Sequence, residues 1–106
     1  MEANERRSDL DGIFASLDEE QRRLISPLLD ELVSMEERLV YLRGLPMLRF
    51  HPKRPELQQY TPAAKQYKET MQSYMNAIRI LCGLLAKTEP SAQDELLKRL
   101  EEFSLS

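Results

Sequence analysis

Cysteine, histidine and glycine are scarce in this chain of 106 residues, and each scarcity excludes a class of function. The single cysteine, Cys82, has no partner for a disulfide within the chain. One cysteine and one histidine are also too few ligands for a zinc site. Three scattered glycines leave no glycine-rich phosphate loop. His51 stands between Phe50 and Pro52, which offer it neither an acid nor a nucleophile. We therefore expect a protein that is not an enzyme and holds no metal and no cofactor.

Long apolar runs are also missing, and large aromatic side chains are few. No segment approaches the roughly 20 apolar residues of a membrane-spanning helix, and the first residues, MEANERRSDLDG, are too polar for a signal peptide. We expect a soluble protein of the cytoplasm that has no contact with a membrane. Because the chain has no tryptophan and three phenylalanines, the core of a single copy would be thin, and self-association is expected.

Acidic residues are abundant in the first part of the chain, where residues 1–40 hold eleven Asp and Glu against five Lys and Arg. Several are adjacent in sequence, as in Asp18-Glu19-Glu20 and Glu36-Glu37. Adjacent residues of a helix do not face each other, so these pairs are not typical of general acid–base catalysis. We interpret all of these carboxylates as solvated surface.

Leucine spacing predicts a first long helix over residues 17–43. Ser16 followed by Glu19 is typical of a capping box at its start. Apolar residues from Leu28 onward recur at alternating steps of four and three, which gives one amphipathic stripe. Pro27 interrupts the pattern and must either kink the helix or start a new one.

A second long helix is predicted over residues 62–87, and Thr61 followed by Pro62 is a typical helix start. Its apolar stripe runs through three heptads, a pattern that packs against a partner helix. The stripe is interpreted either as core against the same chain or as an interface between subunits, and the apolar positions on both of its flanks favour the interface. The proposed interface residues are Tyr67, Met71, Tyr74, Ile78, Leu81 and Leu85.

The predicted fold is all-α, a single helical domain over residues 1–106 that assembles into an oligomer. A polar segment, 1–16, precedes the first long helix, and a short helix over 91–103 follows the second. The matched lengths of the two long helices favour an antiparallel hairpin. The linker, 44–61, could however span roughly 60 Å when extended, so a parallel pair is left open.

This linker is rich in proline and basic residues. Residues 41–80 carry seven Lys and Arg against two Asp and Glu, whereas the chain as a whole has a net charge of −3. Cations spaced along a stiff segment are suited to contact phosphates, mostly without reading sequence. The alternative is a proline-stiffened linker that packs its apolar residues on the helices while its cations face water. The proposed DNA contacts are Arg49, Lys53, Arg54, Lys65 and Lys68.

Several segments of the chain resemble the small terminase subunits of tailed phages and prophages of low-GC bacteria. They are ISPLLDELVSMEERLVYLRGLP and, after it, FHPKRPELQQYTPAAKQYKETMQSYMNAIRIL. The similarity rests on the elements Leu-Pro, HPK.PELQ, TPAAKQYKE and QSYMNAIRIL in that order, and covers about residues 26–85.

The resemblance implies a non-catalytic component of phage DNA packaging in a bacterial host cell. Members of the family form rings through paired long helices, engage double-stranded DNA and regulate a large subunit that carries the ATPase and nuclease. Many also have a separate N-terminal helix-turn-helix domain. The sixteen residues before the first long helix are too few for one, so we do not expect this route to sequence-specific binding. The alternative is a coiled-coil adaptor between proteins that does not bind nucleic acid; a regulatory subunit of an enzyme is a more distant third.

Overall fold

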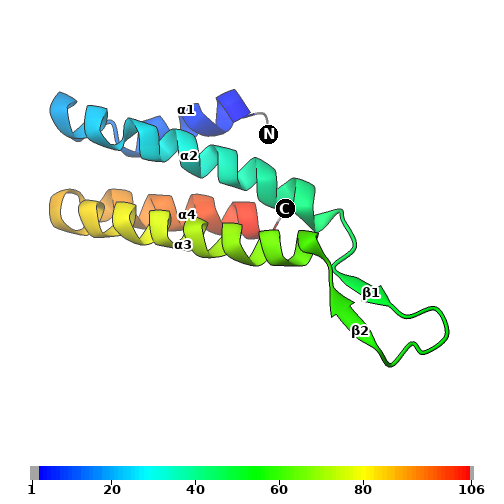
Figure 1. Ribbon diagram of the computed structural model, residues 1–106. Helices are drawn as coiled ribbons and strands as arrows, with labels where there is room; N and C mark the ends of the chain where they lie inside the picture. The colour runs from blue at the N-terminus through cyan, green and yellow to red at the C-terminus, as the bar shows by residue number, and fades with distance from the viewer. Residues whose placement is uncertain (1–2, 106) are drawn as a thin grey trace.

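The computed structural model describes residues 3–105, which form a body of four helices with a small β-hairpin at one end (Figure 1). The molecule is elongated and measures 61 × 25 × 22 Å. The all-α class is confirmed, because the two strands have only three residues each. The elements in chain order are α1 (Ala3–Ile13), α2 (Glu19–Arg43), β1 (Leu48–Phe50), β2 (Gln58–Tyr60), α3 (Pro62–Thr88) and α4 (Pro90–Leu105).

The four helices form a closed circuit of contacts, α1 with α2, α2 with α3, α3 with α4, and α4 with α1. In Figure 1 the two long helices, α2 and α3, run side by side in opposite directions. The turns from α1 to α2 and from α3 to α4 are short, and short connections make successive helices antiparallel neighbours. None of the described helices is both long and apolar enough to cross a membrane.

The N-terminal region differs from the polar segment expected over residues 1–16, because residues 3–13 form α1. Leu10 and Ile13 of α1, and Phe14 directly after it, are buried against the other helices. The stripe occupies little more than one turn, and the polar residues around it conceal it in the sequence. Residues 1 and 2 lie outside the described part.

The start of α2 also differs from the prediction. Asp18, and not Ser16, is the N-cap, and its side-chain oxygen accepts a hydrogen bond from the backbone N–H of Gln21 at 2.7 Å. Pro27 lies inside one continuous helix, so no new helix starts there. The buried side chains of Ile25 and Leu29 on either side of Pro27 belong to the core, and this packing offsets the missing backbone hydrogen bond.

The predicted start of α3 is confirmed. The hydroxyl oxygen of Thr61 accepts a hydrogen bond from the backbone N–H of Ala64 at 3.2 Å, and Pro62 occupies the first turn. The last helix, α4, begins at Pro90 and extends to Leu105, so it is longer than the helix expected over 91–103. Leu96 and Leu100 of this helix are buried in the common core.

A buried polar network lies at the centre of the body, where the sequence had suggested a solvated carboxylate. Glu36 of α2 is only 4% exposed. Arg6 of α1 donates to both of its oxygens, at 2.9 and 3.0 Å, and the hydroxyl of Tyr74 of α3 donates to it at 2.6 Å. Arg6 also donates to the backbone carbonyl of Arg99 in α4 at 3.2 Å. The interpretation of Glu36 as surface is therefore wrong, because the network satisfies its charge inside the core.

The network shifts two pKa values upward. Burial, together with the hydrogen bond and the negative charge of Glu36, raises the pKa of the Tyr74 hydroxyl. Burial lowers the pKa of the Arg6 guanidinium, but the hydrogen bond and charge of Glu36 raise it by more. Both shifts favour the protonated form of the donors, and the hydrogen bonds of the network join all four helices.

Candidate nucleic-acid interface

The expected linker folds into an antiparallel β-hairpin that projects from the end of the helical body (Figure 1). We refer to residues 48–60, the two strands and the loop between them, as the hairpin. Every residue in it is exposed to solvent. The sequence did not predict strands, because three residues on each side are too few to establish an alternating pattern.

Thr61 fixes the base of the hairpin to the helical body. Its hydroxyl donates to the carbonyl of Pro46 at 2.6 Å, and its backbone N–H donates to the carbonyl of Met47 at 3.2 Å. The same side chain caps α3 through Ala64. One residue thus closes the hairpin and starts the helix, which sets the direction in which the hairpin leaves the body.

His51 organises the loop at the tip. Its Nδ1 accepts hydrogen bonds from the backbone N–H groups of Lys53 and Arg54, at 3.1 and 3.2 Å. Its own backbone N–H donates to the carbonyl of Leu57 at 3.1 Å, which continues the pairing of the strands. The only histidine of the chain therefore has a structural role: it holds two proposed DNA contacts in a defined turn.

The pairing of the strands separates the hairpin into two unlike faces. Leu48 is opposite Tyr60, and Phe50 is opposite Gln58, so these four residues share one face. That face is largely apolar. Its large side chains are nevertheless exposed to solvent, Phe50 at 52% and Tyr60 at 81%. The opposite face carries Arg49 and its partner Gln59.

The five proposed DNA contacts are all exposed, and they lie in two groups. Arg49, Lys53 and Arg54 belong to the hairpin, whereas Lys65 and Lys68 lie on the first two turns of α3 at its base. Arg54 is partly neutralised by Glu56, at 3.0 Å. Among the described residues, the side chains of the other four form no hydrogen bond or ion pair.

Lys65 occupies a position that does not favour the helix that carries it. The N-terminus of a helix has a partial positive charge, which disfavours cations in the first turn. The first turn of α3 contains no acidic residue to compensate. Helix stability therefore does not explain a cation at Lys65, whereas an external anion at this end of the helix would be attracted both by the lysine and by the helix dipole.

The proposed subunit interface lies mostly inside the single chain. Tyr74, Ile78, Leu81 and Leu85 are buried in the core of the helical body, in contact with other helices of the same copy. The remaining two, Tyr67 and Met71, are partly buried at the edge of this core. An interface between subunits through the four buried residues would require this packing to open. In this fold the stripe serves the alternative role, as core.

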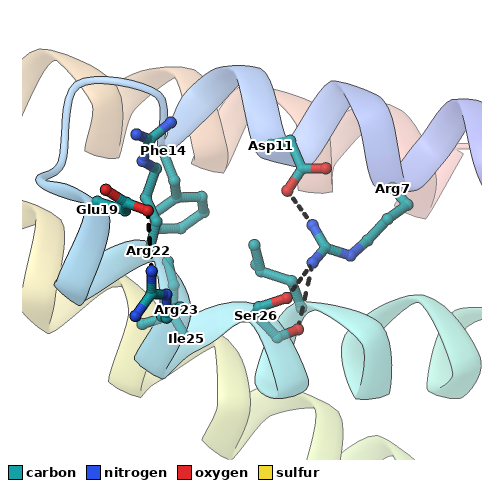
Figure 2. A pocket seen from close by; sticks show the side chains of 9 residues that line it. Arg7, Asp11, Phe14, Glu19, Arg22, Arg23, Ile25 and Ser26 are labelled. Carbon is teal, nitrogen blue, oxygen red and sulfur yellow. Dashed lines mark hydrogen bonds and ion pairs between the residues drawn. The ribbon is translucent and has the colours of Figure 1, made fainter.

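A hollow lies between α1 and α2, at the end of the body remote from the hairpin (Figure 2). Arg7 extends across it, donating to Asp30 at 2.7 Å and to the Ser26 hydroxyl at 2.8 Å, and pairing with Asp11. Burial lowers the pKa of Arg7, but Asp30 and Asp11 raise it by more. Because its guanidinium already has these partners, Arg7 is not free to bind a ligand, and its bonds to Asp30 and Ser26 hold α1 on α2.

Comparison with known proteins gave no match: no family model, no curated protein and no solved structure matches this chain. The residues and the geometry of the hairpin are therefore what indicates its function. Sequence reasoning located its cations but missed Gln59, which is brought beside Arg49 by the pairing of the strands. The alternation of Leu48, Arg49 and Phe50 was the one available signal, and it is short.

Proposed function

We propose that this chain is a non-catalytic DNA-packaging protein, of the kind that serves as the small subunit of a phage terminase, and that it contacts double-stranded DNA through the hairpin. The observation that carries the proposal is the position of Arg49, Lys53 and Arg54 on a projection clear of the helical body. The resemblance in sequence over about residues 26–85 supports the same assignment. In this role the chain assembles with copies of itself and regulates a large ATPase and nuclease subunit in the cytoplasm of a bacterial host.

The distribution of charge supports this orientation toward DNA. Residues 48–68 hold five Lys and Arg against one Glu, a balance of +4. The rest of the chain holds ten cations against seventeen anions, a balance of −7. A polyanion attracts the first region and repels the second, so DNA is approached with the hairpin leading. The acidic body also limits non-specific adhesion elsewhere on the surface.

The test is the salt dependence of binding to a duplex of arbitrary sequence. Wild type should bind at low salt, with the logarithm of the affinity falling by about 0.9 per phosphate contact for each tenfold rise in salt. Replacing Arg49, Lys53 and Arg54 by Ala should flatten this slope. The matched control removes three exposed cations of the body, Arg22, Lys87 and Lys98, and should leave the slope nearly unchanged. Equal losses in both variants, or no binding at low salt, would contradict the proposal.

A protein–protein adaptor is the second candidate, and the apolar face of the hairpin favours it. Leu48, Phe50 and Tyr60 form an exposed apolar surface on a projecting element, which is typical of a contact with another protein. An adaptor should show no retention of DNA at low salt, and the triple variant of the hairpin should behave as wild type. The mass of the native assembly, measured by light scattering, separates a large closed oligomer from the dimer expected for an adaptor.

A further inference from the structure

Arg49 and Gln59 lie side by side on the polar face of the hairpin. Backbone hydrogen bonds join Thr61 to Met47 and His51 to Leu57, on either side of this pair. Because bonded and non-bonded pairs alternate in an antiparallel ladder, Arg49 and Gln59 form a hydrogen-bonded pair, with Cα atoms about 5.5 Å apart. Their side chains therefore leave the same face at neighbouring points.

Neither side chain has a structural partner. Within residues 3–105, the guanidinium of Arg49 and the amide of Gln59 form no hydrogen bond and no ion pair, although both residues are exposed. Other arginines of the chain, such as Arg6, Arg7 and Arg54, contact a carboxylate. The structural requirements of the hairpin thus leave the polar groups of the pair available to a ligand.

The chemistry of the pair suits the edges of bases. A guanidinium donates two parallel hydrogen bonds to O6 and N7 of guanine, and a glutamine amide donates to N7 and accepts from N6 of adenine. The major groove, about 12 Å wide, admits a two-stranded β-ribbon. The strands of such a ribbon are about 4.8 Å apart, and the hairpin projects from the end of the helical body (Figure 1). The opposite face carries no cation, and its amide, Gln58, is paired with Phe50.

We propose that the polar face of the hairpin reads base edges in the major groove, with Arg49 recognising guanine and Gln59 recognising adenine at a neighbouring base pair. This inference rests on the proposed function, since it requires that the hairpin contacts duplex DNA. It adds sequence preference to a contact that the cations alone would make without discrimination. Lys53 at the tip and Lys65 at the base then contact phosphates and set the position of the hairpin in the groove.

The experiment selects bound duplexes from a randomised pool with the wild-type chain. Competition between the selected duplex and a scrambled duplex of equal composition then measures the preference. Wild type should enrich a site that contains guanine near adenine. Gln59→Ala should reduce the preference between about 5- and 150-fold, the range for one bidentate contact to a base. Arg49→Lys should reduce it similarly while keeping the salt slope, because it keeps the charge but loses the planar fork.

Gln58→Ala is the matched control, since Gln58 is the adjacent residue, has the same chemistry and lies on the opposite face. It should keep the preference of wild type. Salt-dependent binding without any enriched sequence would overturn the inference and leave the proposed function standing. An equal loss of preference in Gln58→Ala would also overturn it, because the two faces would then act alike. The absence of any DNA binding would overturn both.

Discussion

Charged and apolar residues are buried and paired in the core of the helical body, whereas in the hairpin they are exposed. In the body, the buried carboxylate of Glu36 has three hydrogen bonds from Arg6 and Tyr74, and the large apolar residues of the core are almost fully covered. In the hairpin, every residue is exposed, and Arg49 and Lys53 have no partner for their side chains among the described residues. The body contains the buried core, whereas the hairpin presents groups that form no contact within the fold. Changes in the two regions should therefore have different consequences.

The largest effect is expected at the centre of the body. Glu36→Ala should lower the free energy of unfolding by about 3–5 kcal/mol, because it leaves the guanidinium of Arg6 buried without its partner. Urea denaturation followed by circular dichroism measures this loss. Glu37→Ala, at the exposed neighbouring position, should stay within about 0.5 kcal/mol of wild type. Similar losses in the two variants would mean that the network does not stabilise the fold.

Truncation of the stripe on α3 should have the next largest effect. Leu81→Ala should cost about 2–5 kcal/mol, since Leu81 is fully buried and leaves a cavity. Ile80→Ala, next to it but exposed, should cost less than about 0.5 kcal/mol. Both are measured by urea denaturation at several protein concentrations. A loss at Leu81 that is independent of concentration assigns the residue to the core of one copy, and a concentration-dependent loss would restore it to an interface between subunits.

The buried hydroxyl of Tyr74 should make stability sensitive to alkali. The pKa of Tyr74 is raised in the folded state. Its contribution to the free energy of unfolding is therefore complete below a pH of about 10, the pKa of tyrosine in the unfolded chain. At higher pH the unfolded chain loses this proton while the folded chain retains it, and the free energy of unfolding falls by roughly 1 kcal/mol per pH unit. Tyr74→Phe should be less stable than wild type at neutral pH. Its free energy of unfolding should not show the fall above pH 10 that comes from this hydroxyl. A difference between the two proteins that stays constant above pH 10 would contradict the assignment.

The smallest effect on stability is expected in the hairpin. His51→Ala removes the acceptor for the backbone N–H groups of Lys53 and Arg54, but it should change the free energy of unfolding by less than about 0.5 kcal/mol. Hydrogen exchange should become faster at these two amides and remain unchanged in α3. A global loss as large as that of Glu36→Ala would show that the hairpin and the body are not separate in stability.

The long helices were predictable because their signals are local and repeated. Thr61 with Pro62 identified the start of α3, and the ends of α2 and α3 lie within two residues of those predicted. The strands and α1 were not predictable in this way. The strands have three residues each, and α1 has one buried turn of apolar residues, so neither is long enough to show its period.

The candidate site was predictable in its charge and not in its geometry. The cations Arg49, Lys53 and Arg54 are visible in the sequence, together with the prolines that separate them. The register that pairs Arg49 with Gln59, and places Phe50 on the other face, depends on contacts between residues ten positions apart. A shift of the register by one residue would exchange the faces of one strand relative to the other.

The sequence by itself determined the helical class, the start of α3 and the separation of a basic segment from acidic flanks, because each depends on the type and spacing of residues that are near neighbours in the chain. Only the tertiary structure decided that Glu36 is buried, that the stripe through Leu81 belongs to the core of one copy, and that the hairpin has two faces. These properties depend on which distant segments meet. Burial and pairing are interactions between such segments, so they have no signature in the sequence of either segment alone.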